Sequence, residues 1–108
     1  MHELAIMQAI IEQVTERLGD RRVTAIHLAV GKMSGVVPDA LRFSFDVATE
    51  GTTLAGATLT IDEPPGRAHC RSCGADFEVD DGIPLCACGS ADVAVWGGDE
   101  LLIHSVSC

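Results

Sequence analysis

Two close pairs of cysteines constrain the fold of this chain more than any other feature of its sequence. Two residues separate Cys70 from Cys73, one separates Cys86 from Cys88, and twelve residues lie between the pairs. The glycine after each pair lets the backbone turn with a positive φ, which brings N–H groups toward the sulfurs. Two chelating loops of this kind supply the tetrahedral four-sulfur shell of a structural Zn²⁺ ion.

The second cysteine pair is irregular, because two intervening residues are usual in such sites. Cys86-Ala87-Cys88 would form a tighter chelate ring, and His69 or Cys108 is then an alternative ligand. Iron bound by four thiolates and a set of disulfides are competing interpretations of the same residues. A redox Cys-x-x-Cys motif would need a helix start and an activating environment, and the sequence indicates neither.

The cysteines fall in a segment that lacks the hydrophobic periodicity of the rest of the chain. Pro64-Pro65-Gly66 ends the regular structure before it, and Cys, Gly and Asp dominate from Arg67 to about Gly98. Segments below roughly 40 residues rarely bury a sufficient core without a metal or disulfides. We therefore expect residues 67–98 to form a zinc-binding domain, inserted into an α/β domain of residues 1–66 and 99–108.

Hydrophobic patterning outside the insertion predicts helices and strands together. Apolar residues recur at helical spacing and then at strand spacing along the chain. The helices are expected at residues 4–18 and 38–50, and the strands at residues 23–30, 57–62 and 100–106. The fold class is thus predicted as α+β, with a small three-stranded sheet, two helices and an inserted zinc-ribbon-like module built on four cysteines.

Charge and composition exclude several classes of partner. Asp and Glu outnumber Lys and Arg by 16 to 7, the formal net charge is -9, and aromatic residues make up 4%. Binding to nucleic acid or to anionic membranes needs clustered cations, so neither partner is expected. The longest apolar runs are four residues, far below the ~20 that cross a bilayer. The opening residues do not resemble a signal peptide, so a reducing, cytoplasmic location is expected, which favours metal binding by the cysteines.

The amino terminus offers a second metal site of different chemistry. The terminal amine of Met1, the amide nitrogen of His2 and the His2 imidazole can form fused chelate rings, and Glu3 can add a carboxylate or another amide. Nitrogen donors in a plane favour Ni²⁺ or Cu²⁺ over Zn²⁺. Met1 is expected to be retained, because removal of the initiator normally requires a small second residue. The competing interpretation is that His2 is an ordinary surface residue.

Two internal histidines fall on predicted strands. His27 lies on the first strand, and strict alternation along the third strand places His104 on the face of Leu102, Val106 and Cys108. Both histidines are interpreted as strand-packing or surface residues, and Cys108 as a free thiol. No Ser, Cys or carboxylate lies in an activating motif with a base partner, so the protein is not expected to be an enzyme.

The sequence also resembles a known family along its whole length. The resemblance begins with Met1-His2-Glu3 and includes the four paired cysteines. The other matching residues are Val30-Gly31, Ser34-Gly35-Val36, Pro38, Ala40-Leu41, Phe43, Phe45, Gly51-Thr52, Gly56-Ala57, Gly89-Ser90 and Gly98-Asp99-Glu100-Leu101. On these residues the chain resembles HypA-type nickel-insertion accessory proteins.

The resemblance implies a nickel metallochaperone for the maturation of [NiFe]-hydrogenase. His2 matches the family's nickel-binding His and Glu3 its neighbour, with Ni²⁺ as transported cargo. The four cysteines match the ligands of a structural Zn²⁺, although Cys86-Ala87-Cys88 is one residue shorter than the Cys-Pro-x-Cys that family members commonly carry. A partner GTPase, the hydrogenase large subunit precursor as recipient, and a monomer or weak homodimer are also implied. The alternatives are a zinc-ribbon protein-interaction adaptor without a nickel role of its own, and a redox or iron protein.

Overall fold

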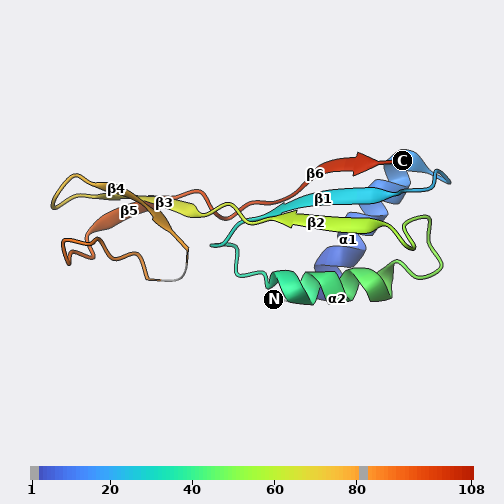
Figure 1. The fold of residues 1–108 in the computed structure, drawn as a ribbon, viewed down its shortest axis with the longest axis horizontal. Coiled ribbons are helices and arrows are strands. Elements are labelled where there is room, and N and C mark those ends of the chain that lie inside the picture. The colour runs from blue at the N-terminus through green and yellow to red at the C-terminus, as the bar shows by residue number, and fades with distance from the viewer. Residues whose placement is uncertain (1–2, 81–82) are drawn as a thin grey trace.

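The computed structural model describes residues 3–80 and 83–108, which form an elongated molecule of 55 × 21 × 18 Å. Two small sheets lie toward opposite ends of the long axis (Figure 1). Both helices pack on the first sheet, and the cysteines lie beside the second. The α+β class predicted from the sequence is confirmed.

The first sheet has the strand order β2-β1-β6. Its strands are β1 (Ala25–Val30), β2 (Thr58–Asp62) and β6 (Leu101–Ser107). β2 runs parallel to β1, and β6 runs antiparallel to β1 on its other side. The third strand therefore rejoins the first two after the cysteine-rich segment, as the apolar pattern predicts.

Two helices cover one face of this sheet, α1 (Glu3–Leu18) and α2 (Pro38–Ala48) (Figure 1). Burial alternates along β1, so Ile26, Leu28 and Val30 face the helices and form a core with residues such as Met7 and Leu41. The alternate residues of β1 and β2 are exposed or half-buried. No described element covers the face that carries them.

The start of α2 lies next to the start of α1. The carboxylate of Glu3 accepts a hydrogen bond of 3.3 Å from the backbone N–H of Val37, which directly precedes α2. Pro38 follows in the first turn, where a missing N–H costs nothing. A carboxylate at this position also faces the positive end of the helix dipole. The contact fixes the first described residue of the chain against the second helix.

The second sheet contains strands that the hydrophobic pattern does not reveal. They are β3 (Gly66–Cys70), β4 (Asp76–Val79) and β5 (Val93–Trp96), all antiparallel in the order β4-β3-β5. Along β3 the buried residues are Gly66, Ala68 and Cys70. These residues are small, so the alternation is present in the structure but nearly invisible on a hydropathy scale.

The link between the two sheets is held against the loop that follows β1. The N–H of Gly31 donates to the carbonyl of Glu100 at 2.7 Å, and the N–H of Met33 donates to the carbonyl of Gly98 at 2.6 Å. A Cβ on Gly31 would overlap that Gly98 carbonyl, and a Cβ on Gly98 would overlap the backbone of Gly66. The crossing therefore requires glycine at these positions.

A bulge in β6 corrects one expectation about His104. The register pairs His27 with Ser105 but Leu28 with Ile103, so His104 has no partner on β1. Ile103 and Val106 both pack against the core. Strict alternation is therefore wrong here, and His104 does not share a face with Val106. An extra residue of this kind re-aims side chains along the bulged strand.

Within residues 3–80 and 83–108, no helix has the length and apolar content needed to span a membrane.

Candidate metal centre

Four cysteine sulfurs converge at the end of the second sheet. Cys70 ends β3, Cys73 lies in the turn that follows, and Cys86 and Cys88 lie in the loop that precedes β5. All four Sγ atoms lie within 4.8 Å of one another. Cys70 and Cys86 are buried, whereas Cys73 and Cys88 are exposed. The centre is thus half-enclosed, with one thiol of each pair facing the protein.

The sulfur spacing fits a tetrahedral metal shell. Cys70 Sγ lies 3.7 Å from Cys88 Sγ, and Cys73 Sγ lies 3.6 Å from Cys86 Sγ. Four sulfurs at a Zn–S distance of about 2.3 Å occupy tetrahedron corners roughly 3.8 Å apart. All five cysteines are free. A single intervening residue therefore does not prevent Cys86 from reaching the other three sulfurs.

Tight backbone turns position the sulfurs. The glycines that follow the two pairs, Gly74 and Gly89, have φ values of 81° and 93°. The N–H of Gly74 donates to the carbonyl of Cys70 at 2.9 Å, and the N–H of Gly89 donates to the carbonyl of Cys86 at 2.8 Å. The N–H of Cys73 points at Cys70 Sγ, 3.4 Å away. These are the positive-φ turns predicted from the sequence.

The thiols differ in their readiness to ionise. The backbone N–H of Cys73 lowers the pKa of Cys70 from its ordinary 9.0 to about 6, although burial opposes the change. The N–H of Cys88 also lowers the pKa of Cys86, but burial and the neighbouring sulfurs outweigh it and raise that pKa to about 12. Four adjacent thiolates repel one another without a cation among them. A divalent ion that takes the place of the protons removes this repulsion.

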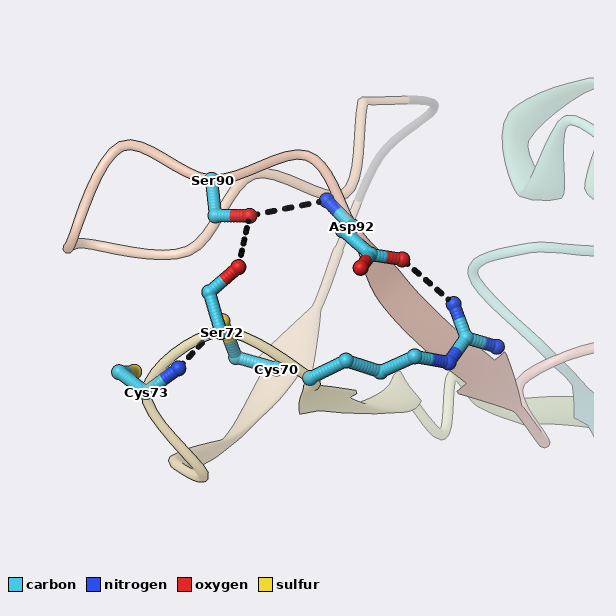
Figure 2. Close-up of polar contacts among 6 residues, drawn as sticks. Cys70, Ser72, Cys73, Ser90 and Asp92 are labelled. Carbon is cyan, nitrogen blue, oxygen red and sulfur yellow. Dashed lines mark hydrogen bonds and ion pairs between the residues drawn. The ribbon is translucent and has the colours of Figure 1, made fainter.

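Polar contacts outside the sulfur cluster join the two cysteine loops (Figure 2). Ser72 Oγ and Ser90 Oγ are 2.8 Å apart, and Ser90 Oγ accepts a hydrogen bond of 3.1 Å from the N–H of Asp92. The Asp92 carboxylate accepts one of 2.9 Å from the Arg71 guanidinium. The Arg71 N–H donates to the Asp92 carbonyl at 3.0 Å. Sequence reasoning missed these residues, and only the position of each serine next to a cysteine hints at their role.

The alternative ligands lie apart from the sulfurs. His69 Nδ1 is 2.7 Å from Asp76 Oδ1, on the paired strands β3 and β4. Cys108 follows β6 at the opposite end of the molecule (Figure 1). Neither belongs to the cluster formed by the described residues. The amino-terminal candidates Met1 and His2 fall outside the described residues, and the Glu3 carboxylate contacts the start of α2.

Comparison with known proteins places these features in a family. A family model described as "Hydrogenase/urease nickel incorporation, metallochaperone, hypA" matches residues 1–108. The chain belongs to the HypA family. Hydrogenase maturation factor HypA of Nostoc punctiforme is 43% identical over 106 residues, which cover 98% of this chain and 94% of that protein. The protein of the same name from Geobacter metallireducens is 44% identical over 107 residues, with 98% and 97% covered.

Solved structures of HypA proteins share this fold. The solution structure of the Ni metallochaperone HypA from Helicobacter pylori matches with a TM-score of 0.62 at 18% identity, covering 99% of this chain and 97% of that one. A second HypA solution structure matches with a TM-score of 0.59 at 19% identity, covering 99% of this chain and 95% of that one. The resemblance stated from the sequence is confirmed, and the protein is a member of a hydrogenase-maturation, nickel-metallochaperone family.

Proposed function

We propose that this HypA-family chain binds Ni²⁺ at its amino terminus and delivers it to the precursor of the [NiFe]-hydrogenase large subunit with the help of a partner GTPase. The observation that supports this proposal is the family match over residues 1–108. The match includes the amino-terminal Met1-His2-Glu3 motif and the cysteine-containing segment 67–98. In this proposal the protein is a carrier and not an enzyme. It acts in the cytoplasm as a monomer or weak homodimer.

The proposed nickel ligands are the Met1 amine, the His2 amide and imidazole, and Glu3. Such nitrogen donors favour Ni²⁺ in a planar arrangement. Support for a defined location comes from Glu3, which begins α1 and contacts the N–H that precedes α2. The Glu3 carboxylate is engaged there, so Glu3 would contribute through its amide unless that 3.3 Å contact opens.

The proposed role of the cysteine cluster is to hold a structural Zn²⁺. Four thiolates at tetrahedral spacing suit zinc, which needs no open position in a structural site. Among the described residues, the main hydrophobic cluster has no member from 67–98, and the buried hydrophobic residues of that segment are Ala68, Cys70, Val79 and Cys86. We infer that this segment is a zinc domain stabilised by its metal, and that residues 1–66 and 99–108 form the nickel domain. Iron suits four thiolates as well, so metal content and an absorption spectrum of the purified protein decide between them.

Nickel titration into three forms of the untagged, zinc-loaded protein tests the amino-terminal site. The native chain should bind Ni²⁺ most tightly, and both His2→Ala and a form with extra residues before Met1 should bind it much more weakly. The matched control is His69→Ala, which removes an exposed histidine engaged by Asp76 and should leave the tight site intact. Equal affinity in all forms would reject the proposed ligands.

Complementation separates the chaperone from an adaptor. A cell that lacks its own HypA should regain hydrogenase activity when it carries the native chain but not the His2→Ala variant. Full activity with His2→Ala would favour the alternative, a zinc-ribbon adaptor that works through protein binding alone. Both forms should be checked for equal abundance, because loss of the protein would mimic loss of nickel transfer.

A further inference from the structure

Two histidines lie side by side on the open face of the β2-β1-β6 sheet. The ring centroids of His27 and His104 are 4.7 Å apart, with an angle of 65° between the ring planes. The bulge in β6 produces this pairing, because it leaves His104 without a partner on β1 while Ile103 and Val106 keep their contacts with the core. Ser105 is the register partner of His27, and His104 is the extra residue next to it on the bulged strand.

An aspartate at the end of β2 orients His27. Asp62 Oδ2 lies 2.7 Å from His27 Nε2. An ionised carboxylate only accepts hydrogen bonds, so Nε2 carries the proton and donates it. In the neutral tautomer with this hydrogen bond, Nδ1 of His27 is the nitrogen that carries the lone pair. Metal-binding histidines commonly donate their second N–H to a carboxylate in this way, which fixes the tautomer and makes the free nitrogen a better ligand.

The separation of the two rings matches that of two imidazoles bound to one ion. A metal–nitrogen bond of about 2.0–2.1 Å puts the ion roughly 3.2 Å from each ring centroid, so ligands about 90–100° apart have centroids roughly 4.5–5 Å apart. The observed 4.7 Å lies within this interval. The side chains are accessible, because His27 is 30% and Asp62 65% exposed, and His104 is exposed.

We propose that His27 and His104 form a second, exchangeable site for a late first-row transition-metal ion such as Ni²⁺ or Zn²⁺, with Asp62 as the residue that positions His27. Imidazole nitrogens suit these ions. Two protein ligands leave the remaining positions to water, so the ion binds more weakly than in a closed four-ligand cage. This site shares no ligand with the amino-terminal motif or the cysteine cluster. It would be a separate metal-binding site, on the open face of the first sheet.

The test uses the zinc-loaded His2→Ala chain, in which the proposed amino-terminal site is removed. Calorimetric titration with Ni²⁺ should show one saturable binding event. Adding His104→Ala or His27→Ala should abolish that event, and adding Asp62→Asn should weaken it by about 10–100-fold, the usual effect of losing such a partner. Titration with diamagnetic Zn²⁺ should shift the NMR signal of His27 Nδ1 more than that of Nε2.

The control variant is His69→Ala, which removes another exposed histidine paired with an aspartate. The part of the chain that the structure describes shows no second imidazole stacked on His69, so its loss should leave the binding unchanged. The inference is overturned if His104→Ala binds Ni²⁺ as the parent does, or if His69→Ala lowers binding equally. Because His104 has no partner on β1, its replacement should keep the β1–β6 register, and unchanged amide signals in the rest of β1 and β6 verify this. The comparison is made within the His2→Ala background, so it stands or fails separately from the proposed amino-terminal site.

Discussion

Replacing Ser90 by alanine should loosen the metal centre without touching a sulfur. Ser90 Oγ interacts with Ser72 Oγ and accepts a hydrogen bond from the N–H of Asp92, so Ser90→Ala removes one hydrogen bond between the cysteine loops and one within the second loop. A hydrogen bond contributes about 0.5–1.5 kcal/mol net, and these two are solvent-exposed, so each belongs at the lower end. Their combined loss of about 1 kcal/mol corresponds to zinc binding that is roughly 5-fold weaker.

Competition for zinc against a chromophoric chelator measures this effect. Ser72→Ala is the matched comparison, because it removes only the 2.8 Å contact between the two hydroxyl groups and should weaken zinc binding less than Ser90→Ala does. The Ser72→Ala, Ser90→Ala double variant should match Ser90→Ala alone, because the second change then removes no further bond. Additive losses, or a larger effect from Ser72→Ala, would refute the reasoning.

Three further predictions address the metal and the core. Chelation of the metal should collapse the amide NMR signals of residues 66–98 while those of the β2-β1-β6 sheet persist, because the hydrophobic core draws on the first sheet and the two helices; loss of all signals, or of none, contradicts this. Zinc binding at pH 7 should release fewer than four protons per ion, because the Cys70 pKa of about 6 leaves that thiol largely ionised beforehand. Calorimetry in buffers of different ionisation enthalpy counts the protons that are released. As the pH falls, protons should displace the zinc ion from the thiolates. Leu28→Ala should lower the free energy of unfolding by about 2–5 kcal/mol in urea, whereas Phe43→Ala, at a side chain that is 72% exposed, should change it by about 0.5 kcal/mol or less.

Sequence periodicity predicts the first sheet and its helices because their buried residues are large. Leu28, Leu41 and Met7 recur at spacings that only one kind of element satisfies, and all three are fully buried. The strands of the second sheet escape this reasoning. β3 buries glycine, alanine and cysteine, whose small side chains carry little hydrophobic signal. Its existence depends on the cysteine loops and on backbone pairing.

Of the candidate sites, the sequence predicts the cysteine cluster but not the serine contacts or the histidine pair. Spacing alone brings Cys70, Cys73, Cys86 and Cys88 together, since chelating loops are short-range features. The serine contacts and the histidine pair are not short-range. Ser72 meets Ser90 only after the loops fold onto each other, and His104 reaches His27 because of a bulge that no residue type announces. Whether His2 binds nickel stays a prediction, since it lies outside the described residues.

The position of β6 after the cysteines along the chain has a consequence for the order of folding during synthesis. Proteins are made from the amino terminus, so β1 is synthesised long before its antiparallel neighbour β6. The ribosome adds β6 only after it has passed Cys88. The emerging polypeptide thus presents all four thiols before the first sheet can be completed. If the cysteines of the newly made segment 67–98 bind a metal ion, the two ends of this segment come close together. The loop that must close when β6 pairs with β1 is then shorter.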